Sequence, residues 1–96
     1  MLETLRRIAF DAAFIGATAI AEDGVYFSYM EDAQVKQAAA LSARQVVVVS
    51  ETEKFQIQAP YRGLELGQID TLITDKKLAQ TQKQWFPTKT DFLIGD

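Results

Sequence analysis

Four consecutive valines, Val46 to Val49, constrain the fold of this chain more than any other feature. β-Branched side chains favour extended backbone, and an unbroken apolar run leaves a strand no polar face to turn toward water. The run is bounded by Gln45 and Ser50. It therefore predicts a short strand buried on both faces, which is typical of parallel sheets.

Three further short apolar runs end in turn-prone residues, as a strand does. Together with the valine run, they predict four buried strands, near residues 12–16, 45–50, 70–74 and 91–94. Strands that alternate with helical segments form βαβ units with right-handed crossovers. The predicted fold class is α/β, with an open, mainly parallel, Rossmann-like sheet and flanking helices.

The helical segments lie between these strands. Met30 to Arg44 is rich in Ala, Gln and Lys and predicts a helix over 30–43, with Ser28 and Glu31 at the spacing of a capping box. Shorter helices are expected over 1–9, where Leu2, Leu5 and Ile8 have helical spacing, and over the polar segment 76–83. The stretch 56–67 contains Pro and Gly and is expected to be a loop with at most one helical turn.

Composition narrows the functional classes. The chain has 96 residues, so it holds one domain, and its net charge of −3 argues against direct contact with DNA phosphates. It has no His and no Cys, which excludes Ser-His-Asp and Cys-His catalysis and ordinary zinc sites. Gly16 is followed by Ala17, Thr18 and Ala19, so no dinucleotide-binding turn is present. We expect no catalytic residue, metal or cofactor.

Location follows from the same features. No apolar run approaches the ~18 residues that cross a bilayer, and no secretory leader is recognisable. We therefore expect a cytoplasmic protein without a membrane partner.

Ligands of open parallel sheets bind at the carboxyl ends of the strands, where helix amino termini gather. In this chain that edge is predicted to comprise Gly16 to Ala19, Ser50 to Phe55, Thr74 with Asp75, and Gly95 with Asp96. Lys54 is the loop cation nearest to it. The arrangement suits a ligand with a phosphate group.

Each candidate residue also has a purely structural interpretation. Gly16 is suited to a tight turn, and a lysine such as Lys54 is commonly a solvated surface residue. Asp32 and Lys36 lie one turn apart on the predicted helix, where they would form a surface ion pair. The residues alone leave these alternatives open.

Four sequence blocks resemble the DeoR-type repressors of bacterial sugar metabolism, in the order and at the intervals of that family. The blocks are Asp11 to Ala17, Asp32 to Lys36, Val47 to Val49 leading to Glu51 to Phe55, and Ile69 to Asp75. The resemblance covers residues 9–75. It implies the carboxyl-terminal part of an effector-sensing domain whose fold is similar to that of sugar-phosphate isomerases.

Such repressors join a DNA-binding helix-turn-helix to a sensor for a phosphorylated sugar or sugar alcohol. The resemblance implies that residues 1–96 are a partial sensor without the helix-turn-helix and the first half of the sensor, and that DNA is contacted only through the absent part. Carried over by position, the effector-binding residues would be Gly16, Asp32, Lys36 and Lys54. The family commonly has Glu at the position of Asp32 and Asp at that of Glu51, so the reach of these side chains differs from that in the family.

Two alternatives accompany this hypothesis. One is a fragment of a sugar-phosphate isomerase or deaminase, although the segment after Gly16 offers no general acid-base group. The other is a pure oligomerisation module. Because a partial sensor exposes apolar surface and a sheet edge, we expect a homo-oligomer that buries Phe and Val side chains near the edge, with Trp85 and Phe86 as further candidates. Effector binding by these residues alone is expected to be weak.

Overall fold

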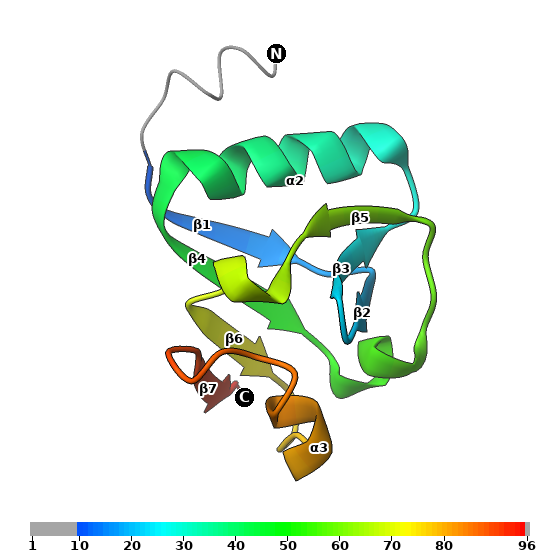
Figure 1. Cartoon of the computed structure of the whole chain (residues 1–96), viewed down its shortest axis with the longest axis vertical. Helices are drawn as coiled ribbons and strands as arrows, with labels where there is room; N and C mark the ends of the chain where they lie inside the picture. The colour runs from blue at the N-terminus through cyan, green and yellow to red at the C-terminus, as the bar shows by residue number, and fades with distance from the viewer. Residues whose placement is uncertain (1–9, 96) are drawn as a thin grey trace.

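The structure, a computed structural model, describes residues 10–95. Its main sheet consists of β1 (Phe10–Gly16), β4 (Ala43–Ser50), β6 (Thr71–Thr74) and β7 (Asp91–Ile94). The strands lie in the order β1-β4-β6-β7, and every neighbouring pair is parallel (Figure 1). The parallel sheet and the position of each of its strands were predicted correctly. The helix expected over 1–9 lies outside the described residues.

A second, antiparallel sheet was not predicted. It contains β2 (Ala19–Ala21), β3 (Gly24–Phe27) and β5 (Tyr61–Leu64), in the order β2-β3-β5. The expectation of a loop over 56–67 is therefore wrong for β5. Gly63 explains how this strand fits, because a Cβ there would lie 2.5 Å from the Phe27 ring. Only glycine allows the strand to approach that ring so closely.

Helix α2 (Met30–Ser42) lies along β1 and β5, and the short helix α3 (Gln80–Lys83) precedes β7 (Figure 1). The predicted capping box is wrong: Tyr29 is the N-cap, and its side chain makes no capping hydrogen bond within the described residues. Glu31 and Asp32 instead place negative charge in the first turn, where the helix dipole favours it. Only the last part of the helix expected over 76–83 is helical.

Two 3-10 turns complete the described chain. The first, η1 (Thr52–Gln56), directly follows β4, and the second, η2 (Leu66–Gln68), precedes β6. A capping box does occur at η2, where Glu65 and Gln68 bond each other's backbone.

The two faces of the main sheet differ in burial. Residues paired in parallel strands share a face, and on one face Ile15, Val48 and Leu72 lie in the core with Phe27 of β3 and Ala33 of α2. On the opposite face Phe14, Val49 and Leu93 are 73%, 45% and 53% exposed. We call these three residues the uncovered sheet face. The prediction of strands buried on both faces holds for Val46 to Val48 but is wrong for these three exposed positions.

Within residues 10–95, no helix is long and apolar enough to cross a membrane.

Candidate functional site

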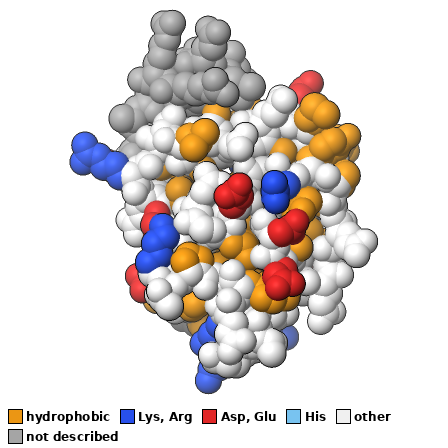
Figure 2. Space-filling view, in the orientation of Figure 1, with side chains coloured by type: hydrophobic (Ala, Val, Ile, Leu, Met, Phe, Trp, Pro, Cys, Tyr) orange, Lys and Arg blue, Asp and Glu red, His pale blue; other side chains and the backbone are white. Residues whose placement is uncertain are grey.

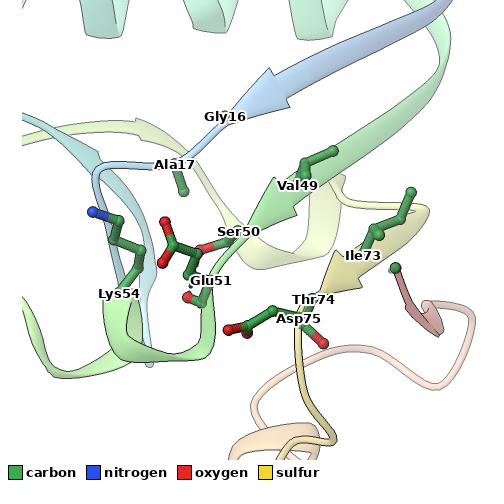
Figure 3. Close-up of a pocket in the computed structure, with 10 residues that line it drawn as sticks. Gly16, Ala17, Val49, Ser50, Glu51, Lys54, Ile73, Thr74 and Asp75 are labelled. Atoms are coloured by element: carbon green, nitrogen blue, oxygen red, sulfur yellow. Dashed lines mark hydrogen bonds between the residues drawn. The ribbon is translucent and has the colours of Figure 1, made fainter.

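A cavity of about 340 Å³ opens at the carboxyl ends of β1, β4 and β6 (Figure 3). Its lining comes from the strand ends and the segments that follow them: Gly16, Ala17, Val49, Ser50, Glu51, Lys54, Ile73, Thr74, Asp75 and Gly95. These residues lie on the sheet edge at which the sequence predicts ligand binding. The parallel order of the strands brings them together, because every strand of the main sheet ends on the same side.

Hydrogen bonds join the strand ends into one rim. The backbone N–H of Thr52 donates to Oδ1 of Asp75 at 2.8 Å, which ties η1 to the end of β6. The N–H of Gly95 donates to the carbonyl of Thr74 at 2.8 Å, which extends the rim to the segment after β7. Opposite walls of the cavity are therefore held to the same strand end.

The cavity combines both signs of charge. Among the described residues that line it, Lys54 is the cation, and Glu51 and Asp75 are the carboxylates. In the view of Figure 3, the Glu51 carboxylate lies between the Lys54 amine and the Asp75 carboxylate. The hydrogen bond from the Thr52 N–H lowers the pKa of the Asp75 carboxyl, against a smaller opposing effect of desolvation. Asp75 is therefore an acceptor at neutral pH.

This set of side chains suits a polyhydroxylated anion. The Lys54 ammonium can donate charge-assisted hydrogen bonds to a phosphate or carboxylate. The two carboxylates can accept hydrogen bonds from hydroxyl groups of the ligand. An anion without hydroxyl groups has no hydrogen to donate to them.

The backbone at position 16 does not require glycine. No glycine among residues 10–95 has a positive φ, and a Cβ built at Gly16 meets nothing within 4 Å. A tight turn therefore does not explain the residue. The space that a side chain would fill is part of the cavity.

Asp32 and Lys36 lie elsewhere. Both are on α2, with 3.7 Å between Lys36 Nζ and Asp32 Oδ1, and both are partly solvent-exposed. Lys36 lines a separate groove of about 200 Å³ between α2 and β1. The structure thus brings Gly16 and Lys54 to one cavity and leaves Asp32 and Lys36 outside it, in the arrangement of a helix-surface pair. Their role in effector binding stays a prediction.

Glu51 and Asp75 are lining residues that the sequence analysis placed at the edge but did not select for the site. Their position directly after two predicted strands was the available signal. Residues 10–95 contain no cluster of three or more acidic side chains arranged to hold a metal ion.

Comparison with known proteins adds a family. Residues 1–76 match the family described as the DeoR C terminal sensor domain. The chain is 34% identical over 76 residues to the HTH-type transcriptional repressor GlcR of Bacillus subtilis (strain 168), a match that covers 79% of this chain and 30% of that protein. It is 32% identical over 77 residues to the uncharacterized HTH-type transcriptional regulator YgbI of Escherichia coli (strain K12), covering 80% of this chain and 30% of that protein. The chain thus spans less than a third of each relative.

Proposed function

The chain belongs to the family of DeoR C-terminal sensor domains, and from this premise we propose that it is the effector-sensing module of a transcriptional repressor and binds a phosphorylated sugar or sugar alcohol. The observation that carries the proposal is the cavity that Gly16, Lys54 and Asp75 line together. Lys54 would bind the phosphate, while Glu51 and Asp75 would accept hydrogen bonds from sugar hydroxyls. The open space at Gly16 would let the ligand approach the backbone of β1.

Sensing without catalysis fits the residues of the cavity better than turnover does. Isomerisation of a sugar phosphate needs a group that moves a proton at the reacting carbon, with a pKa near the working pH. Asp75, whose pKa is lowered, is poorly suited to that role. The names of the two relatives describe regulators of transcription.

DNA contact is assigned to another segment of the repressor. Over the visible face of the described residues, acidic and basic side chains are interspersed and form no continuous basic patch (Figure 2). A protein that binds DNA through phosphate contacts needs such a patch. We also propose that residues 1–96 are one part of a longer sensor. The support for this is that the matches cover only 30% of each relative.

The function is tested by isothermal titration of the 96-residue chain, at concentrations that detect weak binding, with a panel of phosphorylated sugars and sugar alcohols. Each titration is paired with the unphosphorylated compound and with inorganic phosphate. The proposal is supported if at least one phosphorylated compound binds more tightly than both its unphosphorylated form and inorganic phosphate. Equal heats for the phosphorylated and unphosphorylated forms across the panel would reject a phosphate site.

Self-association is the second part of the proposal. The uncovered sheet face is apolar, and β1 is an edge strand whose outer backbone groups have no neighbouring strand among the described residues. Unprotected edges and apolar faces of this kind favour pairing between chains. We propose that a second copy of the chain covers this face. Because Val49 belongs both to this face and to the cavity lining, the second copy would also lie beside the effector site.

A further inference from the structure

Three phenylalanine rings form a row between two walls of the cavity. Phe55 lies in η1, directly after Lys54, and its ring centroid is 6.4 Å from that of Phe86. Phe86 in turn meets Phe92 of β7 edge to face, with 5.4 Å between centroids. Gly95, which lines the cavity, follows three residues after Phe92. The row therefore joins the wall that carries Lys54 to the wall formed by the end of β7.

The central ring is fixed by its surroundings. Phe55 and Phe86 are both buried members of the main core cluster, and Trp85 and Phe92 pack against that cluster. Trp85 adds a second contact to Phe55, at 6.1 Å between ring centroids, and the Lys83 ammonium lies 5.6 Å from the centroid of Phe92. Close-packed rings hold few alternative positions, so a shift at one end of the row displaces the other.

The turn η1 has little stability of its own. It is a single stretch of 3-10 helix, with the Lys54 N–H bonded to the Glu51 carbonyl at 3.0 Å and the Ile57 N–H to the Lys54 carbonyl at 3.4 Å. Such short pieces depend on tertiary contacts. The tertiary contacts of η1 include strand β2, the Asp75 carboxylate at its start and the aromatic neighbours of the Phe55 ring at its centre.

We propose that Phe86 is a positioning residue for Lys54, and that the row Phe55, Phe86 and Phe92 couples the lysine-bearing turn to β7 and so sets the width of the cavity. Two of the three rings belong to residues 77–96, beyond the segment that matches the sensor family. Residues 77–96 would then adjust, in this chain, the shape of a cavity whose other walls come from the segment that matches the family. The inference rests on the proposed function only for the identity of the ligand, because the coupling itself exists without one.

Amide hydrogen exchange on the 96-residue chain, resolved by residue with NMR, tests the coupling. Phe86→Leu keeps an apolar side chain but removes both ring contacts, and it should speed exchange at Lys54 and Ile57 by roughly tenfold, as the loss of two aromatic contacts implies. Val48, in the centre of β4, should change much less. Tyr29→Leu is the matched control, because Tyr29 is an exposed aromatic residue at the start of α2 and lies outside the row. Equal acceleration at Val48 and Lys54 would mean general destabilisation and would overturn the proposal.

Phe92→Leu decides the question if Phe86→Leu does not fold. Phe92 is partly buried, at the far end of the row from η1, so its replacement is the milder change. A coupled row predicts faster exchange at Lys54, by roughly threefold, as well as at the end of β7. Acceleration confined to β7 would overturn the coupling.

A parallel titration separates this inference from the proposed function. Trp85 is the only tryptophan of the chain, so its fluorescence reports on the neighbourhood of Phe55. Inorganic phosphate and the sugar phosphates of the panel are added to the unmodified protein. If exchange shows the coupling and no compound binds, the proposed ligand is wrong and the positioning role of Phe86 stands.

Discussion

Thr52 and Asp75 are 23 positions apart in the sequence, and the backbone N–H of Thr52 donates a 2.8 Å hydrogen bond to Oδ1 of Asp75. The bond holds the first residue of η1 against the residue that follows β6. Lys54 therefore leaves a turn that is fixed at its start by a carboxylate and at its centre by the Phe55 ring. A lysine on such a support has a narrower range of positions than one on a free loop, which favours recognition of a particular ligand geometry.

Gly16 gives the most direct test of the cavity. We expect Gly16→Ala to leave the fold intact and to raise the free energy of unfolding by about 0.5 kcal/mol, because the site has room for a methyl group and the φ is not positive. The same methyl group would occupy ligand space and weaken effector binding by roughly tenfold. Thermal unfolding and calorimetric titration measure the two effects.

Gly67→Ala is the control for that variant. Gly67 also has open space around a built Cβ, but it lies in η2 and does not line the cavity. It should share any gain in stability and keep unaltered binding. If both variants bind as the unmodified protein does, the ligand does not approach Gly16.

Lys54 is the second test. Replacing its ammonium group removes a charge-assisted hydrogen bond, so Lys54→Met should weaken binding of the effector by about tenfold or more. Lys36→Met removes the same charge from α2, outside the cavity, so its loss of binding should be smaller than that of Lys54→Met. The reverse order of the two effects, measured by calorimetry, would move the site to the groove beside α2.

The pH dependence of the free energy of unfolding should reveal the contribution of the Asp70 carboxylate. The Val46 N–H donates to Asp70 at 2.8 Å and lowers the pKa of that carboxyl, with a further contribution from Lys89. Since the folded-state pKa lies below the ordinary value of 3.8, the stabilisation is fully present above 3.8 and is lost as pH falls through the lower, folded-state pKa. Denaturant unfolding of Asp70→Asn across this range should show a shallower acid limb than the unmodified chain. Equally steep limbs would mean that Asp70 does not contribute.

The main sheet could be predicted because its central strands are apolar runs, with β-branched residues at Val46 to Val49. Parallel strands all end at the same edge of the sheet, so the residues that follow them, Gly16 and Lys54 included, could be placed in one region. The small antiparallel sheet could not be predicted in the same way. β2 has three residues and β5 contains Gly63, so neither carries a periodic pattern. Its stability comes from tertiary contact, which local sequence does not encode.

The same limit applies to the site. Asp32 and Lys36 were selected from a resemblance and from helical spacing. This spacing shows that the two side chains are neighbours on the helix, but it does not show how far they lie from the cavity. The contacts of Phe86 with Phe55 and Phe92 depend on how distant segments meet. Trp85 and Phe86 were expected at an interface between chains, whereas Phe86 is buried within its own chain.

Self-association through the uncovered sheet face is the last prediction. Phe14 is 73% exposed on edge strand β1, and a second copy would remove it from water. Full burial of such a side chain contributes about 1.5–3 kcal/mol, so Phe14→Asp should shift the assembly toward monomer by at least tenfold in dissociation constant. Sedimentation velocity across a wide concentration range measures the shift.

Tyr29→Asp is the matched control for this experiment. Tyr29 is 74% exposed, but it is the N-cap of α2 and lies off the main sheet, so the same charge there should leave the assembly unchanged. A stable assembly should bury about 1,200 Å² or more of surface in total. A chain that stays monomeric at every concentration would show that no second copy covers Phe14. Equal loss of association in both variants would point to a general effect of added negative charge on a chain that already has a net charge of −3.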